Sequence, residues 1–337
     1  GAGMTVITKK FANELGLEIE GNIKGKGVGN LVDVSFTNLP EFSLPGLNFN
    51  SQKVAVIEIS NLFHKWLGLD VAGIIGYDFL SRLVVKVDYA NELLSFYNPD
   101  EFEYRGFGKV IDAPLSGNMF HVPLTVDGEY GGKWNLDLGA GGMSFHHPFA
   151  KKHGFLDKKG VKKLGGGAGG TVESQVLMFD EIEFGGYKLQ NIPISMPLEE
   201  GEGAFASSEL SGNAGNTVFE HFILYLDYKR EQVIIEKGDY FGKLFPRDNS
   251  GLNVLNTADN ELEVEYISEN SPAEKAGFMA GDIIISVNGI NAEFLGGIRA
   301  VNKMLEAEPD TKYTIVVDRD GKEEKLKIKL ADLFRTK

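Results

Sequence analysis

The stretch Asn135-Leu136-Asp137-Leu138-Gly139-Ala140-Gly141 decides our prediction of the fold. An apolar run leads into Asp137, and a glycine-rich turn follows at once. Because glycine tolerates tight turns and backbone N–H groups are strong donors, such a turn can hold a carboxylate at the end of a strand. One Asp beside a glycine is common, so a second observation is needed before this stretch predicts a fold.

A second copy of the turn opens the chain. Gly1-Ala2-Gly3 matches Gly139-Ala140-Gly141 at an offset of 138 residues (139 minus 1), and the residues that follow keep nearly the same offset. The further matches are Phe11-Ala12 with Phe149-Ala150, Gly16 with Gly154, Gly76 with Gly215, and Asp88 with Asp227. A nearly constant offset over this length predicts an internal duplication with two similar lobes.

Duplicated turns of this type resemble those of the retropepsin-like aspartic proteases, which carry Asp-Ser/Thr-Gly-Ala once in each lobe. The resemblance covers residues 1–240 and implies that Asp137 is the catalytic Asp of the second lobe. The matching Asp would stand two residues before Gly1, outside this sequence. The family has Ser or Thr where this chain has Leu138, and in the family that hydroxyl ties the two turns together.

The resemblance also implies which residues contact the substrate. In the turns these are Gly1, Ala2, Gly139 and Ala140. Two glycine-rich segments, Lys24–Gly29 and Leu164–Gly170, favour mobile hairpin tips that approach a ligand closely. In the family such a hairpin covers the substrate, which implies binding roles for Gly27 and Gly167. The alternatives are plain flexible turns or a phosphate loop, and the second fits poorly because no Gly-Lys-Ser/Thr follows.

The C-terminal part has a different pattern. Ser271-Pro272-Ala273-Glu274-Lys275-Ala276-Gly277 predicts a capped short helix, Gly281-Asp282 a turn, and Val287-Asn288-Gly289 the end of a buried strand. These motifs at this spacing resemble bacterial PDZ domains, which bind peptides as an added strand. We expect the groove between 251–256 and the amphipathic helix 298–305. The residues expected to line it are Gly251, Leu252, Val254, Ile298 and Val301.

The predicted fold is therefore mainly β, with two duplicated retropepsin-like β-barrel lobes followed by a PDZ domain. We place the first lobe at residues 1–107, the second at 108–245 and the PDZ domain at 246–337. The lobes are joined near 102–109, and the polar, proline-containing segment 245–250 precedes the PDZ domain. In the resembled family, an apolar-glycine element packs beneath each catalytic turn. Ile74-Ile75-Gly76 fits this element well, and Asn213-Ala214-Gly215 fits it less well.

The composition of the chain argues against several classes of binding partner. The net charge of −14 without a long basic run argues against nucleic acid and anionic membranes. No apolar run is long enough to span a membrane, and no signal peptide is visible. The absence of cysteine excludes disulfides and thiol chemistry. His146, His147 and His153 lack an acidic partner at ligand spacing, so we predict no metal and no cofactor.

The leading prediction is an aspartic endopeptidase whose PDZ domain recruits peptide substrates or partners. The alternative is an inactive peptide-binding protein that keeps the protease fold, and a purely structural interaction protein is a third possibility. PDZ-bearing proteases of this kind work outside the bacterial cytoplasm, so the resemblance implies a periplasmic or secreted protein. The substrate sequence, PDZ ligand and oligomeric state do not follow from these residues.

Overall fold

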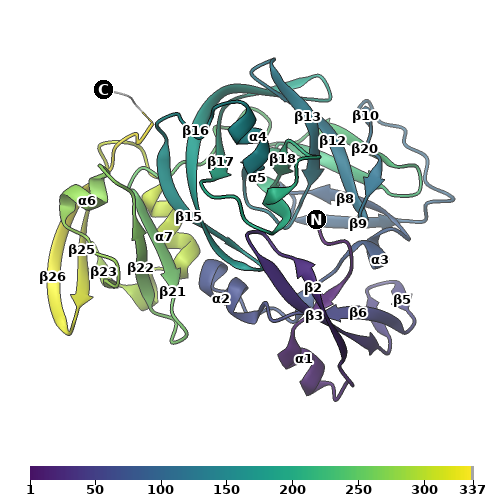
Figure 1. Ribbon diagram of the computed structural model, residues 1–337, viewed down its shortest axis with the longest axis horizontal. Helices are drawn as coiled ribbons and strands as arrows, with labels where there is room; N and C mark the ends of the chain where they lie inside the picture. The colour runs from purple at the N-terminus through teal and green to yellow at the C-terminus, as the bar shows by residue number, and fades with distance from the viewer. Residues whose placement is uncertain (335–337) are drawn as a thin grey trace.

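The computed structural model describes residues 1–334 and is built mainly from β-strands. Two lobes lie together, and the C-terminal domain lies at one end of the molecule (Figure 1). The predicted fold class is confirmed, whereas the exact domain boundaries stay a prediction. Residues 335–337 of the predicted third domain lie outside the described residues.

The first repeat folds around a five-stranded sheet in the order β2-β3-β6-β1-β7. Its strands are β1 (Val6–Ile7), β2 (Glu20–Lys26), β3 (Leu31–Leu39), β6 (Gln52–Val56) and β7 (Gly73–Ile74). A separate hairpin and three helices complete it: β4 (Phe42–Leu44), β5 (Leu47–Phe49), α1 (Lys9–Glu14), α2 (Ser60–Leu67) and α3 (Tyr77–Leu80). Thr8 caps α1, because its side chain accepts a hydrogen bond from the Phe11 N–H.

The second repeat contains an eight-stranded sheet in the order β11-β12-β13-β18-β14-β17-β16-β15. Its strands are β11 (Leu115–Ser116), β12 (Met119–Val126), β13 (Tyr130–Leu136), β14 (Met143–Phe145), β15 (Val161–Gly167), β16 (Gly170–Phe184), β17 (Tyr187–Pro197) and β18 (Gly212–Ala214). Its helices are α4 (His147–Lys152), η1 (Ala204–Ala206) and α5 (Asn216–Phe219). Helix α4 has Pro148 in its first turn, where a residue without an N–H leaves no hydrogen bond unmade.

The internal duplication is visible in the strand pairing. In the first repeat, β1 pairs with β6 in parallel and with β7 in antiparallel, so that Val6 faces Ala55 and Ile74. In the second repeat, β14 pairs with β17 in parallel and with β18 in antiparallel, so that Ser144 faces Ser195 and Asn213. Val6 and Ser144 are related by the offset found in the sequence. The two halves therefore share both topology and register.

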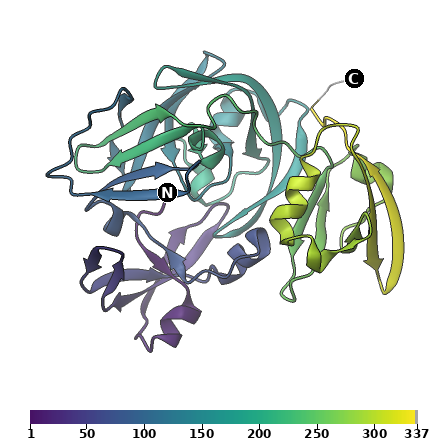
Figure 2. The ribbon, with the colours of Figure 1, turned by 180° about the vertical axis from the view of Figure 1, so that it is seen from behind.

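The two repeats also share one sheet, in the order β10-β20-β19-β8-β9. Its strands are β8 (Val84–Asp88), β9 (Leu93–Tyr97), β10 (Lys109–Asp112), β19 (Phe222–Asp227) and β20 (Gln232–Lys237). At its centre, β8 of the first repeat runs antiparallel to β19 of the second, with Val85 opposite Leu226. Figure 2 shows this sheet seen from behind. A backbone ladder thus joins the lobes directly.

The C-terminal domain is a sheet in the order β21-β22-β23-β25-β26, with β24 beside β23. Its strands are β21 (Leu252–Asn256), β22 (Leu262–Ile267), β23 (Ile283–Val287), β24 (Ile290–Asn291), β25 (Lys312–Arg319) and β26 (Lys322–Lys329). Its helices are α6 (Pro272–Ala276), η2 (Ala292–Phe294) and α7 (Gly297–Leu305). The predicted Ser271 cap, Gly277 stop and Asn288-Gly289 turn are all present, and both turn residues have positive φ as such a turn requires.

Three hydrophobic clusters stabilise these parts. The largest runs through the second lobe and the shared sheet and includes Phe79 of the first repeat. A small cluster around Ile7 and Val54 holds the sheet of the first repeat, and another fills the C-terminal domain. Within residues 1–334, no helix combines the length and apolar character needed to cross a membrane.

Candidate active site

The two duplicated turns lie against each other at Asp137. The Gly1 nitrogen is 2.9 Å from Asp137 Oδ1, and a Cβ added to Gly1 would lie 2.3 Å from Asp137 Cγ. Within its own turn, Asp137 Oδ1 accepts a hydrogen bond of 2.8 Å from the Gly139 N–H. The carboxylate is about one-fifth exposed, at 21%. The structure therefore brings Gly1 of the first turn against Asp137 of the second, and a side chain at position 1 would force the Asp137 carboxylate to move.

An equivalent backbone hydrogen bond fixes each of the two turns. The Tyr77 N–H donates to the Ala2 carbonyl at 2.9 Å, and the Asn216 N–H donates to the Ala140 carbonyl at 2.8 Å. The glycine before each donor must stay small: a Cβ on Gly76 would lie 2.2 Å from the Met4 carbonyl carbon. A Cβ on Gly215 would lie 2.5 Å from the carbonyl oxygen of Ala140. The weaker sequence match at 213–215 thus has the same geometry as the stronger match at 74–76.

Leu138 leaves the second turn without a side-chain hydroxyl, and its side chain packs on the main hydrophobic cluster. Asn216 supplies a polar link instead. Its Nδ2 donates to the Leu138 carbonyl at 2.8 Å, and its Oδ1 accepts from the Tyr89 hydroxyl at 2.5 Å. Tyr89 follows β8 of the first repeat, so the link crosses between lobes. Burial, reinforced by the Glu220 carboxylate, raises the pKa of Tyr89 and keeps it protonated as a donor.

An equivalent contact between the lobes is made at the turn of the first repeat. Tyr77 occupies the position of Asn216 in the first repeat, and Tyr228 that of Tyr89 in the second. Their rings meet edge to face, with centroids 5.7 Å apart. Each turn is therefore backed by a residue that reaches the opposite lobe, through a hydrogen bond on one side and an aromatic contact on the other.

The two glycine-rich hairpins meet at their tips. The Val28 N–H donates to the Ala168 carbonyl at 2.5 Å. A Cβ on Gly27 would lie 2.1 Å from that carbonyl oxygen, and one on Gly167 would lie 2.2 Å from Val28 Cγ2. The carbonyl of Gly27 also accepts the Ala204 N–H at 2.7 Å. Gly27 and Gly167 are thus brought to one place, where small residues allow close backbone contact.

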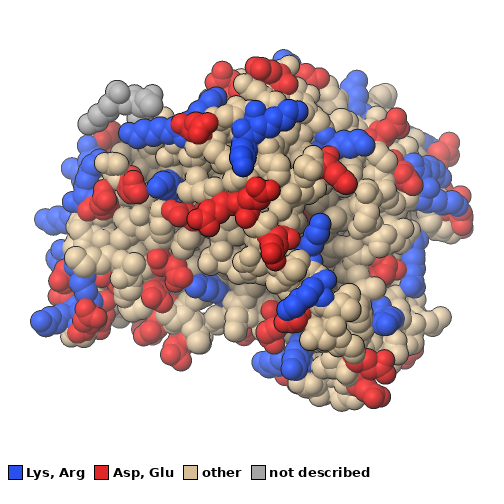
Figure 3. Space-filling view, viewed as in Figure 1, with Lys and Arg blue, Asp and Glu red and all other residues tan. Residues whose placement is uncertain are grey.

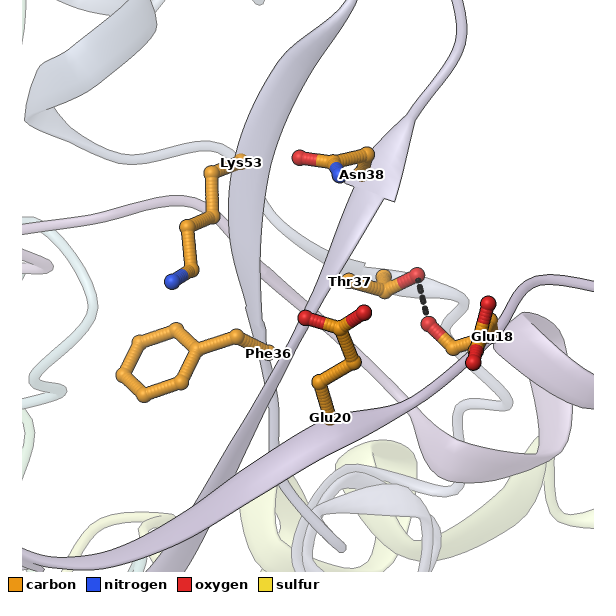
Figure 4. Close-up of a pocket in the computed structure, with 6 residues that line it drawn as sticks. All are labelled: Glu18, Glu20, Phe36, Thr37, Asn38 and Lys53. Carbon is orange, nitrogen blue, oxygen red and sulfur yellow. Dashed lines mark hydrogen bonds between the residues drawn. The ribbon is translucent and has the colours of Figure 1, made fainter.

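The described cavities lie elsewhere. One of about 230 Å³ is lined by side chains of the first sheet, including Glu20, Phe36 and Lys53 (Figure 4). There the Thr37 hydroxyl donates to the Glu18 carbonyl, and the Lys53 ammonium lies 4.6 Å from the Phe36 ring centroid. A second cavity of about 220 Å³ involves His121 and Lys133. Neither includes Asp137.

Within the described part of the chain, the placement of charges and histidines indicates no second functional site. On the face in Figure 3, acidic and basic residues are interspersed in small groups. Within residues 1–334, no group of three His, Asp or Glu is placed to hold a metal ion. His146 is buried, with its ring bonded to the Ser207 carbonyl and to Asn213 Oδ1, and burial lowers its pKa. His147 bonds the Pro197 carbonyl, so both are structural side chains.

Comparison with known proteins agrees with this geometry. The family model for aspartyl proteases matches residues 1–79 and 122–203, and the model for PDZ domains matches residues 263–319. The chain joins an aspartyl protease region to a PDZ domain. A search of curated protein sequences found no match.

Solved structures similar to the chain include a retropepsin-like aspartic protease from Rickettsia conorii, at 20% identity and a TM-score of 0.30, covering 40% of this chain and 96% of that one. An aspartic proteinase from Irpex lacteus aligns at 10% identity and a TM-score of 0.40, and the alignment covers 73% of this chain and 90% of that one. An aminopeptidase N family protein from Idiomarina loihiensis aligns at 24% identity and a TM-score of 0.23, and the alignment covers 27% of this chain and 15% of that one.

The residues predicted to line the PDZ groove are brought together, but chiefly as core. Leu252, Val254, Ile298 and Val301 are at most 6% exposed and pack in one cluster. Any contact that Leu252 and Val254 make with a ligand would therefore come mainly through the backbone of β21, whereas Ile298 and Val301 lie on α7. Gly251 has a φ of +80°, and a Cβ there would lie 2.2 Å from Ser271 Cβ.

Sequence reasoning missed the residues that connect these parts. Asn216 and Tyr89 were not singled out, although the repeat pairs each with a tyrosine in the other half. Helix α2 was also missed, because its cap residue Ile59 makes no side-chain cap bond. None of its residues is buried, so only its tertiary contacts reveal its role.

Proposed function

We propose that the protease region is an aspartic endopeptidase and that the PDZ domain recruits extended peptide segments. The observation that carries the proposal is the meeting of two equivalent turns at the carboxylate of Asp137. Each turn is fixed by the same backbone bond, from Tyr77 in one repeat and Asn216 in the other. This is the arrangement needed to hold two carboxylates face to face.

The proposed chemistry follows from such a pair. Two carboxylates a few ångströms apart share one proton, because two negative charges so close cannot both form cheaply. The ionised member takes a proton from a bound water, which attacks the scissile carbonyl. The protonated member donates a hydrogen bond to the carbonyl oxygen as negative charge develops. Asp137 is one member, and the proposal requires its partner to stand two residues before Gly1.

The test is cleavage of denatured casein between pH 3 and pH 7 by the protein with its natural N-terminus, which sequencing of that terminus establishes. Asp137→Asn should abolish cleavage, because an amide can neither share the proton nor act as a base. Asp112→Asn is the matched control, since this exposed Asp lies on β10 of the shared sheet. Cleavage that survives Asp137→Asn would remove Asp137 from the mechanism.

Leu138 favours one alternative: a protein that binds peptides without cutting them. A displacement of about 1 Å at a reacting group can cost about 100-fold in rate, and the turn lacks the hydroxyl link of the family. Retention of casein peptides without cleavage, in wild type and Asp137→Asn alike, would support this alternative. We further propose a bacterial, extracytoplasmic protein, which fractionation of the producing cell would test.

A further inference from the structure

Helix α2 connects three parts of the molecule. It belongs to the first lobe, yet it packs against β21 and α7 of the PDZ domain and against β15 of the second lobe. Both ribbon views show it between the first lobe and α7 (Figures 1 and 2). These contacts indicate that α2 helps to place the PDZ domain.

The end of α2 closes one end of the space between β21 and α7. Asn256 Nδ2 at the end of β21 donates to the His64 carbonyl at 3.2 Å, and His64 Nε2 lies 3.0 Å from the Thr257 carbonyl oxygen. A Cβ on Gly68 would lie 3.3 Å from Ile298 Cγ2 of α7. The chain at 64–68 thus touches both walls of the expected peptide groove.

The other end is closed by a carboxylate of the chain itself. Asp248 accepts the Ser250 N–H at 2.8 Å and the Gly251 N–H at 2.9 Å, just before β21. Among the described residues, β21 pairs only with β22, so its second edge has no strand partner. A peptide added to that edge would meet α2 at one end and Asp248 at the other.

Trp66 of α2 contacts both the PDZ domain and the tip of the β15–β16 hairpin. Its indole packs on the PDZ cluster, and a Cβ on Gly166 of β15 would lie 2.2 Å from Trp66 Cε2. Beside it, the side chain of Asn253 on β21 makes two bonds with the backbone of Leu164, of 3.3 and 3.2 Å. Lys65 and Glu265 form an ion pair of 2.9 Å across the same contact.

We propose that the PDZ domain, through α2, latches the β15–β16 hairpin in its closed position. While 64–68 fills the end of the groove, Trp66 holds Gly166, and the hairpin tip stays against the tip of β2–β3. A peptide that adds to β21 must displace the end of α2, which frees Trp66 and then the hairpin. The regulatory meaning of this latch rests on the proposed function, but the latch itself does not require proteolysis.

Hydrogen exchange tests the latch without any substrate. In Trp66→Ala, amides of residues 161–172 should exchange about tenfold faster, as loss of a partly buried aromatic contact implies. The strands β8 and β19 should be unchanged. Leu67→Ala is the matched control, because Leu67 lies on the same helix and is 39% exposed. Equal exchange in the two variants, or equal acceleration in β19, would overturn the latch.

A cross-link gives the opposite perturbation. The chain has no cysteine, so Lys65→Cys with Glu265→Cys can be joined by a short bismaleimide and compared with the same protein capped by a monofunctional maleimide. The joined protein should exchange its hairpin amides more slowly than the capped one. Unchanged exchange would overturn the proposal even if Trp66→Ala does not fold. Failure of Asp137→Asn to affect cleavage would alter neither result, so the two proposals fail separately.

Discussion

At the scale of single residues, the candidate site depends on how an apolar residue is accommodated next to Asp137. The Leu138 side chain cannot form a hydrogen bond, and Asn216 instead joins the Leu138 carbonyl to the Tyr89 hydroxyl. Buried polar groups cost free energy when a partner is removed, so this chain of bonds is sensitive to the loss of any member. It also joins the first lobe to the turn of the second.

We expect Tyr89→Phe to lower the free energy of unfolding by about 1–3 kcal/mol, because Asn216 Oδ1 is left without its donor. If the protein cleaves peptides, kcat should fall more than KM changes, since the substrate contacts remain while the turn shifts. Urea unfolding and cleavage kinetics measure the two effects. Tyr97→Phe is the control, because Tyr97 is 37% exposed on β9. Equal stability of the two variants would contradict this role.

His146 gives a prediction on pH. Burial lowers the pKa of its ring, so below pH 6.5 the unfolded state binds a proton more readily than the folded state. The stability contributed by the neutral ring is complete above that pH and is lost as the pH falls. The stability difference between wild type and His146→Gln should therefore shrink from pH 7 to pH 5. A difference that grows would show that the two oxygen partners favour the charged ring.

At the scale of elements, the short segments with clear end signals were predictable. Ser271 caps its helix as expected, and Gly277 adopts the positive φ typical of a residue just after a helix. Thr8, Gly16 and Gly154 give the same kinds of signal at α1 and α4. Helix α2 was not predictable, because its stability comes from the PDZ domain and β15, far away in sequence. The turn around Asp137 could be predicted from its repeat, whereas its link to Tyr89 could not, since it depends on packing between lobes.

The hairpin tips allow a prediction at this scale. Gly27→Ala places a methyl group 2.1 Å from the Ala168 carbonyl oxygen, and backbone on both sides cannot give way locally. The tips should separate, and overpacking should cost about 1–3 kcal/mol. Exchange of the Val28 amide, which donates to Ala168, should accelerate. In Gly165→Ala, the control on β15, the new Cβ lies 3.8 Å from the Val172 oxygen in ordinary contact. Slow Val28 exchange in Gly27→Ala would show that the tips tolerate the methyl group.

At the scale of the whole molecule, the offset between the repeats predicts two similar lobes but not how they are joined. The pairing of β8 with β19 brings together residues more than 130 positions apart, such as Val85 and Leu226. Apolar alternation along a strand indicates that it belongs to a sheet. It does not identify the neighbouring strand, because many strands of one protein share the same alternation. Because the lobes share this sheet, we expect them to unfold together.

The shared sheet leads to our last prediction. Leu226 is 2% exposed near the end of β19, between β8 of one repeat and β20 of the other. Leu226→Ala should cost about 2–5 kcal/mol, as for other leucines in packed cores. Because the sheet belongs to both lobes, hydrogen exchange should accelerate together in β6 and in β17, each of which lies in only one repeat. Leu94→Ala is the control on the same sheet, since Leu94 is 57% exposed. Acceleration in β17 alone would show that the lobes unfold independently in spite of the common ladder.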